Sequence, residues 1–287
     1  MNRARRCASR RSMGLTSLRA TSSTRSSPDV EIYQALVSWL HAEGGNVDPA
    51  VQLTVEDGGA GRGLLSRRQV AAGERLIVVP ASAQLSCSSG SDGADTDSDK
   101  ALRALMNTVN PDVRGMRLGL RMLQEKVKSE SAEGSKFGIY IKSLPSSHDD
   151  MPLYYAEDIP EIQFSNVEQQ AVAAITELLH LTQRCLSIHD TAADPFMGAA
   201  IDIGALLWAT ASASSRAVEA DAEDERLIPI VDLINHSFDA NCLLEHAAEV
   251  AGHGALAVTA RKDIGVGESL RLSYGDVSQQ LNEFSVI

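Results

Sequence analysis

Three polar residues interrupt an apolar run in the segment 226-RLIPIVDLINHSFDANC-242. The run opens with Leu227–Val231, which predicts a buried strand, and Asp232, Asn235 and His236 follow it. Buried polar groups need hydrogen-bond partners, because an unpaired polar group in a protein interior is costly. The partners could be internal, with Asp232 and Asn235 capping a turn and His236 satisfied within the core. A bound ligand would satisfy them equally well, and the triplet alone leaves both interpretations open.

Other common chemistries lack the residues they need. The four cysteines, at positions 7, 87, 185 and 242, form no CxxC pair, so we expect reduced thiols rather than a disulfide framework or a zinc cage. The seven histidines form no HExxH or HxH pair, and we therefore expect no metal site. No GxSxG segment occurs, so nothing indicates a serine hydrolase.

The elements that would position the triplet follow the order strands, helices, strands. A helix is expected at 30–44, and short strands joined by glycine turns are expected at 51–80. Helical patterns then occupy 100–109, 115–128, roughly 166–187 and 200–218. Strand character returns from Leu227 and continues through 255–260 and 270–274. Two strand groups that flank a helical insertion predict one α+β domain interrupted in sequence.

The longest helical pattern, roughly 166–187, has one apolar stripe that predicts its buried face. The stripe consists of Val167, Ala171, Ile175, Leu178, Leu179, Thr182 and Leu186. The stretch 86–99, in contrast, is rich in Ser, Asp and Gly and is expected to be a mobile acidic loop. The expected divisions are therefore a segment 29–99 that ends in this loop, a helical insertion 100–225 and a C-terminal segment 226–287.

The first 28 residues differ in charge from the rest of the chain. Residues 1–28 contain seven Arg, seven Ser and no acid, a composition typical of a mitochondrial or chloroplast transit peptide; a basic tail that binds nucleic acid is the alternative. Without this segment the basic residues number 26 − 7 = 19 against 38 acids, a formal charge of −19. This large negative charge argues against a surface that binds nucleic acid. No apolar run approaches the roughly 18–20 residues of a membrane helix, so no membrane association is expected.

The chain resembles the SET-domain methyltransferases, specifically the branch of the Rubisco large-subunit lysine methyltransferase. Single motifs of this kind are weak, but here they occur in the family's order over most of residues 30–280. The motifs are Trp39-Leu40, 61-GRGL-64 with 73-GERLIVVP-80, 123-LQEK-126, 137-FGIYIKSLP-145, Trp208-Ala209 with Ser215-Arg216, 229-PIVDLINHS-237 and 263-DIGVGESLRLSYG-275. The family usually has Trp where this chain has Phe137.

The resemblance implies a β-rich SET fold of the α+β class, with a knot-like C-terminal part, that binds S-adenosylmethionine. The implied cofactor-binding residues are Ala60, Gly61, Arg62, Gly63, Arg216, Asn235 and His236. Gly61 and Gly63 would let the backbone approach the ligand, although an ordinary hairpin turn is the alternative. Ala60 replaces an acid of some relatives, so a contact there would use the backbone only. Arg216 would hold the cofactor's carboxylate in a bidentate pair, and a solvated helix C-terminal cap is the alternative.

Within the same resemblance, two chain segments cross at the Asn-His pair. The Asn235 amide would bind the amino-acid end of the cofactor, and His236 would position the adenine largely through its main chain. Asp232 matches a substrate contact of the family. Tyr274 would be the catalytic residue and a substrate contact, with its oxygen orienting the incoming amine; a strand-end tyrosine anchored by its hydroxyl is the alternative. These motifs contain no obvious base, so desolvation beside the sulfonium would lower the pKa of the lysine and water would take its proton.

The chain departs from the family after Gly275. The family continues with an Asn-containing helix, an aromatic-Gly-Phe segment and a large helical domain, whereas this chain has 276-DVSQQLNEFSVI-287, with Gln279 about where Asn is expected. We therefore expect cofactor binding to be kept and substrate capture to be affected.

The expected function is transfer of a methyl group to a lysine of a protein substrate, such as Rubisco, an aldolase or a ribosomal protein. We expect a monomer without nucleic-acid or membrane partners, located in the chloroplast, with the mitochondrion as the alternative. Three other hypotheses stay open: a SET-like binding module without turnover, a histidine-directed methyltransferase, and an unrelated acidic α+β scaffold.

Overall fold

The computed structural model describes residues 28–56, 61–87, 96–111, 113–132, 134–148, 151, 153, 166–221 and 224–275. Several sequence-based expectations therefore lie outside the described residues. These are the transit peptide up to residue 27, the Ala60 contact, most of the acidic loop (88–95) and the C-terminal stretch 276–287 with Gln279.

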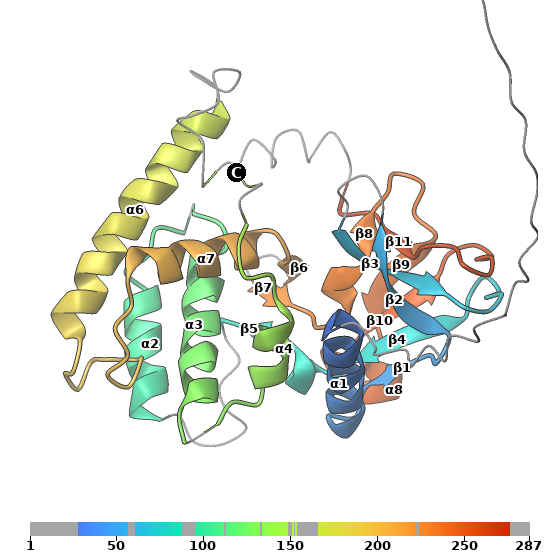
Figure 1. The fold of residues 1–287 in the computed structure, drawn as a ribbon, viewed down its shortest axis with the longest axis horizontal. Coiled ribbons are helices and arrows are strands. Elements are labelled where there is room, and N and C mark those ends of the chain that lie inside the picture. The colour runs from blue at the N-terminus through green and yellow to red at the C-terminus, as the bar shows by residue number, and fades with distance from the viewer. Residues whose placement is uncertain are drawn as a thin grey trace, which may run out of the picture.

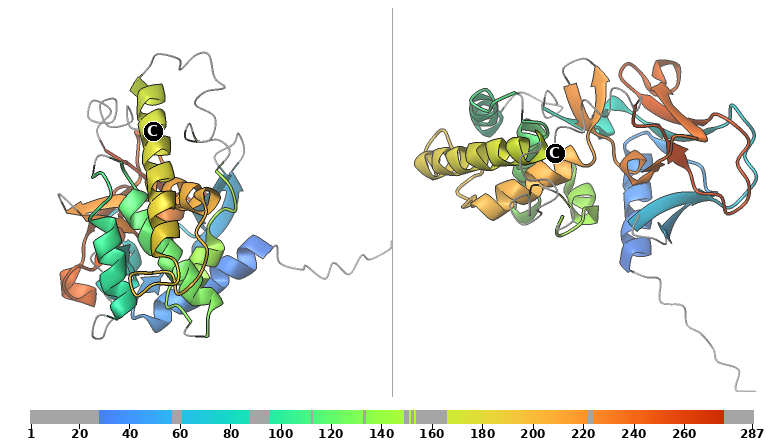
Figure 2. Two further views of the ribbon diagram at one scale, coloured as in Figure 1. Left: turned by 90° about the vertical axis from the view of Figure 1, so that its left-hand side faces the viewer. Right: turned by 90° about the horizontal axis from the view of Figure 1, so that it is seen from above.

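The chain forms a strand half and a helical half, which lie side by side in Figure 1 and again in the view from above in Figure 2. The strand half contains α1 (Pro28–Ala42), β1 (Asn46–Val47), β2 (Val51–Glu56), β3 (Gly61–Ser66), β4 (Arg75–Val79), β8 (Asn235–His236), β9 (Cys242–His246), α8 (Ala248–Ala251), β10 (Leu256–Ala260) and β11 (Arg271–Leu272). The helical half contains α2 (Asp97–Met106), α3 (Met116–Glu130), α4 (Gly138–Ser143), α6 (Asn166–Ile188) and α7 (Ile203–Ser214). A small sheet of β5 (Leu85–Ser86), β7 (Asp224–Leu227) and β6 (Val218–Asp221) lies between the halves. The expected α+β class is confirmed.

The largest sheet joins the two ends of the described chain. Its order is β1-β4-β10-β9, so β10 from the C-terminal segment pairs antiparallel with β4 from the N-terminal segment. Leu76, Ile77 and Val258 at this pairing are fully buried, which explains the apolar run of β4. The helical half is thus inserted between strands of one sheet, as the sequence pattern predicted.

Close packing of α3 on α7 organises the helical half. A Cβ atom on Gly119 of α3 would lie 3.0 Å from the Ala209 backbone of α7, so glycine permits the approach of the two helices. Trp208 directly precedes Ala209 in α7, and its indole donates a hydrogen bond to the Pro145 carbonyl at 2.8 Å. This bond connects the segment after α4 to α7.

A buried charged network joins α2 to α3. Thr96 and Asp99 form a capping box at the start of α2. The Asp99 carboxylate, 1% exposed, also accepts hydrogen bonds from Arg121 and Lys128 of α3, at 3.2 and 3.1 Å. Arg121 pairs in addition with Glu125 at 3.0 Å. Because these charges are paired and hydrogen-bonded, they can be buried between the helices.

The apolar stripe predicted for α6 is partly wrong. The residues of α6 that are buried are Ala171, Ala174, Leu178, Leu181 and Cys185. Leu179 and Leu186, both in the predicted stripe, are 49% and 61% exposed. The apolar arc of this helix is wider than the face that packs, so periodicity placed the centre of the stripe about 60° around the helix from the centre of the buried face.

Three predicted boundaries also differ from the structure. The expected strand Leu227–Val231 stops at Leu227, because Pro229 cannot donate to a ladder and Ile230 takes a positive φ of 73°. Part of the expected loop 86–99 is helical, since α2 begins at Asp97, and the expected helix 200–218 ends at Ser214. The 225/226 division therefore cuts through β7, and Pro28, assigned to the transit peptide, is the first residue of α1.

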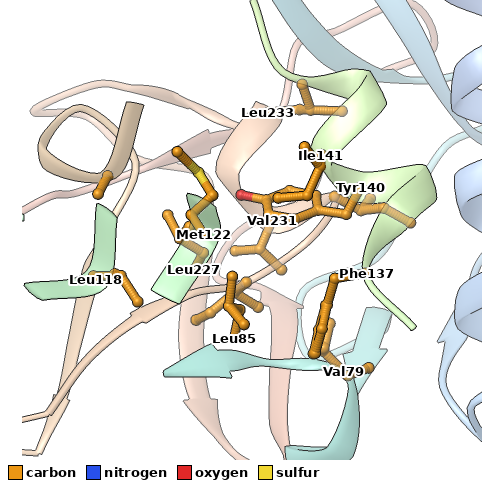
Figure 3. Packing of buried hydrophobic residues seen from close by; sticks show 14 of the residues in the cluster. Val79, Leu85, Leu118, Met122, Phe137, Tyr140, Ile141, Leu227, Val231 and Leu233 are labelled. Atoms are coloured by element: carbon orange, nitrogen blue, oxygen red, sulfur yellow. The ribbon is translucent and has the colours of Figure 1, made fainter. Parts of the chain in front are cut away.

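The two halves meet in an apolar core that supports the polar triplet. Figure 3 shows the Tyr140 ring among side chains of both halves and of the small sheet. The residues labelled there are Val79, Leu85, Leu118, Met122, Phe137, Tyr140, Ile141, Leu227, Val231 and Leu233. Val231 and Leu233 flank Asp232 in a short 3-10 turn, Val231–Leu233, so their burial fixes the backbone at that residue.

Candidate active site

The Asn-His pair lies where two distant segments run together. Strand β8 pairs in parallel with β11, with Asn235 opposite Arg271 and His236 opposite Leu272. The Ser237 amide extends the pairing by donating to the Leu272 carbonyl at 2.9 Å. Two chain segments therefore meet at the Asn-His pair, as expected, and the structure identifies the second one as the segment that leads to Tyr274.

The glycine motif lies beside this pair. Gly61 and Gly63 belong to β3, which forms an antiparallel hairpin with β2, and Gly61 has a positive φ of 69° that favours glycine. The Asn235 Nδ2 group donates to the carbonyl of Arg62 at 3.3 Å. The Arg62 side chain bonds to the Ser143 carbonyl at 2.8 Å and pairs with Asp29 at 3.5 Å. Arg62 thus brings its main chain to Asn235, while its guanidinium joins β3 to α4 and α1.

Arg216, Asp232 and Tyr140 form a buried polar triad. The Asp232 Oδ2 atom accepts hydrogen bonds from the Tyr140 hydroxyl at 3.0 Å and from Arg216 Nη1 at 3.2 Å. Arg216 Nη1 also lies 3.3 Å from the Asp232 carbonyl. The Asp232 side chain is only 2% exposed. The carboxylate expected to meet a substrate is therefore committed to orienting Arg216.

Burial and the Asp232 charge shift the protonation equilibria of this triad. Burial, reinforced by Asp232, raises the pKa of Tyr140 well above its usual value. Burial opposes the charge of Arg216, but the Asp232 carboxylate and the tyrosine hydroxyls more than compensate and raise the pKa of the guanidinium. Tyr140 is thus a neutral donor and Arg216 a permanent cation at physiological pH.

Tyr274 is held at the end of β11 by contacts with the Asn-His segment. Its hydroxyl donates to the Ile234 carbonyl at 2.6 Å, and its amide donates to His236 Nδ1 at 3.2 Å. Its ring lies 5.2 Å from the His236 ring. Burial of the hydroxyl, and then the Asp232 charge, raise its pKa, so the group stays protonated. The alternative of a hydroxyl-anchored tyrosine describes this geometry, and the residue is still 52% exposed, so its ring remains accessible.

Two buried nitrogen atoms near these residues have no hydrogen-bond partner in the described part of the chain. They are Arg216 Nε and His236 Nε2. Buried donors are nearly always paired, so each orphan atom needs a partner beyond the described residues. His236 Nδ1 accepts the Tyr274 amide, so the imidazole proton lies on Nε2 and makes that atom a donor.

Sequence reasoning missed two residues of this site. Tyr140 was noted only as part of the motif 137–145, because its contact with Asp232 spans 92 positions and no local pattern signals it. Phe238 was not singled out either, although its ring lies 4.7 Å from His236 at 89°. An exposed aromatic residue two positions after a polar pair was the available signal.

One group of possible metal ligands occurs in the described part of the chain, at the C-terminal end of α6. His189, Asp190 and Asp194 each place one ligand atom within 4.8 Å of the others. Asp194 already accepts amide hydrogen bonds from Asp190, Phe196 and Gly198, which makes it a loop cap. The expectation of no metal site stays a prediction.

Cys242 is buried in β9, and none of the described helices is long and apolar enough to cross a membrane.

Comparisons with known proteins agree with this architecture. The family model of the SET domain matches residues 61–275. The N-lysine methyltransferase setd6 of Xenopus laevis is 24% identical over 267 residues, which cover 84% of this chain and 54% of that protein.

Solved structures share the fold. The SET domain of LSMT bound to lysine and AdoHcy superposes with a TM-score of 0.64 at 20% identity, over 87% of this chain and 54% of that one. Rubisco LSMT bound to AdoMet superposes with a TM-score of 0.60 at 18% identity, over 87% of this chain and 53% of that one.

The chain belongs to the SET-domain family. It is similar to LSMT and setd6, and it spans about half of the length of these relatives.

Proposed function

We propose that this protein is an S-adenosylmethionine-dependent protein-lysine N-methyltransferase. The carrying observation is that Arg216 Nε and His236 Nε2 are buried, lack partners among the described residues and belong to two residues that the SET resemblance assigns to the cofactor. The setd6 relative is an N-lysine methyltransferase, and the LSMT structures hold AdoMet or AdoHcy with lysine. Their names supply the reaction class, and this chain supplies groups that suit it.

The residues present fit the cofactor. Asp232 occupies the Nη1 edge of Arg216, which leaves the Nε edge for a carboxylate. The side-chain amide of Asn235, which donates to the Arg62 carbonyl, can bind the amino-acid end of the cofactor. The adjacent backbone of Gly61–Gly63 has no Cβ atom at either glycine, so a ligand can approach it closely. When bound, S-adenosylmethionine supplies an electrophilic methyl group on a cationic sulfonium.

The protein's own contribution is orientation and electrostatics. Tyr274, neutral and held by its hydroxyl on the Ile234 carbonyl, presents an oxygen and a ring where the accepting amine would be aligned. The Asp232 carboxylate adds negative charge beside a site that receives cations. A direct substrate contact by Asp232 stays a prediction, because its side chain is buried and committed to Arg216 and Tyr140.

Calorimetric titration of S-adenosylmethionine into residues 29–287 tests the proposal. Asn235→Ala removes one amide and is expected to weaken binding at least tenfold, since a lost bond to a charged ligand group is worth about 1.5–3 kcal/mol. Ser38→Ala, on the exposed side of α1, is the matched control and should bind as the wild type does.

The two outcomes are distinct. Loss of binding in Asn235→Ala alone supports the cofactor site, and methyl transfer from labelled cofactor into protein extract then identifies the acceptor. A folded wild-type protein that binds no S-adenosylmethionine contradicts the proposal.

We further propose that residues 1–28 direct the protein into an organelle, the chloroplast in preference to the mitochondrion, and that its substrate is a protein of that compartment. The Arg- and Ser-rich, acid-free composition supports this. A fluorescent reporter fused to residues 1–35 should accumulate in the organelle, and a reporter that stays in the cytosol contradicts it.

A further inference from the structure

The ring of Tyr274 is fixed mainly by one neighbour. Strand β11 ends two residues earlier, at Leu272, so the sheet does not define the orientation of Tyr274. Besides the hydroxyl bond to Ile234, Tyr274 makes two contacts with His236 within the described residues: the amide bond to Nδ1 and the ring contact at 5.2 Å. The position of Tyr274 is therefore coupled to the rotamer of His236.

His236 in turn has few contacts that fix its ring. Its Nδ1 atom accepts from Tyr274, and its Nε2 atom has no partner among the described residues. Apart from Tyr274 itself, the ring contact is Phe238, 4.7 Å away with the two planes at 89°, the edge-to-face arrangement that aromatic pairs prefer. Without that ring, the imidazole would be held mainly by Tyr274, the residue that it has to position.

Phe238 contributes little to the core. Its side chain is 71% exposed, and it is absent from the buried cluster. Core packing does not explain why the exposed Phe238 ring lies against His236, because removing the Phe238 ring would open no cavity in the core.

We infer that Phe238 is a positioning residue, which holds Tyr274 in place for methyl transfer by an edge contact that fixes the His236 imidazole. The chain of contacts is Phe238 ring to His236 ring, His236 Nδ1 to Tyr274 amide, and Tyr274 hydroxyl to Ile234 carbonyl. The effect of Phe238 on methyl transfer rests on the proposed function, whereas its effect on the orientation of the His236 ring does not.

The test combines a spectroscopic and a kinetic measurement on the full chain. In the wild type, the ¹⁵N shifts of His236 should show one tautomer with the proton on Nε2, because Nδ1 accepts a hydrogen bond. The resonance is assigned by its loss in His236→Asn. In Phe238→Ala the shifts should move toward an average of two tautomers. The turnover number should fall about two- to tenfold, the loss expected for one aromatic contact.

Three further variants make the result specific. Phe238→Tyr keeps the ring and should retain the wild-type tautomer and turnover. Phe238→Leu keeps apolar bulk without the ring and should behave like Phe238→Ala. Val266→Ala removes an equally exposed apolar side chain, 71%, in a turn of the strand half and should change neither measurement.

Each contrary outcome is informative. Unchanged His236 shifts and turnover in Phe238→Ala would overturn the inference while leaving the proposed function intact. Full rescue by leucine would overturn the role of the ring. If the wild type transfers no methyl group, the proposed function fails, and the tautomer measurement alone still decides whether Phe238 fixes His236.

Discussion

At the scale of single residues, the site is built from contacts that are distant in sequence. Asp232 meets Tyr140 and Arg216 through one carboxylate oxygen, and the three residues come from the 3-10 turn Val231–Leu233, from α4 and from the segment after α7. The arrangement assigns Asp232 a supporting role that its motif did not indicate. It also explains how a carboxylate only 2% exposed is tolerated beside an apolar core.

Tyr274→Phe tests the catalytic assignment. The phenylalanine keeps the ring contact with His236 but loses the oxygen, so the turnover number should fall by about a hundredfold, the scale of losing one preorganised donor in an active site. Binding of S-adenosylmethionine should be nearly unchanged. The measurement is single-turnover transfer from labelled cofactor, and an unchanged rate would mean that the hydroxyl only anchors the strand end.

Arg216→Lys tests the guanidinium. Lysine keeps the positive charge but cannot hold Asp232 on one edge and a carboxylate on the other. Affinity for S-adenosylmethionine should fall about tenfold or more, while decarboxylated S-adenosylmethionine should lose much less. Equal losses for the two ligands would show that Arg216 does not bind the carboxylate.

At the scale of elements, the buried network of Asp99 links the helical half. Although its burial opposes ionisation, hydrogen bonds from Thr96 and Lys128 outweigh it and hold the pKa of Asp99 well below its usual value. A depressed folded-state pKa stabilises the fold above the unfolded pKa of about 4, and this contribution is lost as pH falls below that value.

Asp99→Asn should therefore destabilise the protein by about 3 kcal/mol at pH 7, because it leaves Arg121 and Lys128 without their shared carboxylate. The difference in unfolding free energy between wild type and variant, measured by urea denaturation, should shrink as pH falls from about 5 toward 3. Asp97→Asn, on the exposed start of the same helix, is the control and should differ little from the wild type. A pH-independent difference would contradict the assignment.

The sequence predicted helices and strands well where a residue pattern is compatible with one arrangement only. The stretch 116–130 packs on nearly all sides and formed α3 close to the expected 115–128. The sequence-based prediction failed where a pattern is compatible with several arrangements. In α6 the wide apolar arc did not indicate that Leu179 is exposed while Leu181 is buried. The crossing of two segments at Asn235 followed from the family resemblance, whereas the identity of the second segment came from the structure. The Tyr140–Asp232 bond did not follow from the resemblance, because it depends on how two halves of the molecule fit together.

At the scale of the whole molecule, each half is organised by one packed unit: the largest sheet in the strand half and the α3–α7 pair in the helical half. Amide hydrogen exchange should be slowest in β4, β10, α3 and α7, whose side chains include the most deeply buried of the described residues. Helix α6, on the outer side of the helical half in Figure 1, should exchange faster. Mass spectrometry of exchanged peptides measures this, and slower exchange in α6 than in β10 would contradict this order of local stability.

The pairing of β4 with β10 has a consequence for biosynthesis. Leu256 pairs with Val79, so 256 − 79 = 177 residues separate the partners. At about 5–20 residues per second, a ribosome needs roughly ten to thirty-five seconds to supply β10 after β4 has been made. All of α2 to α7 is translated in that interval, and Tyr274 comes later still. Until then the apolar strand β4 can pair only with the two-residue strand β1, and the candidate active site is the last part of the described fold that can form.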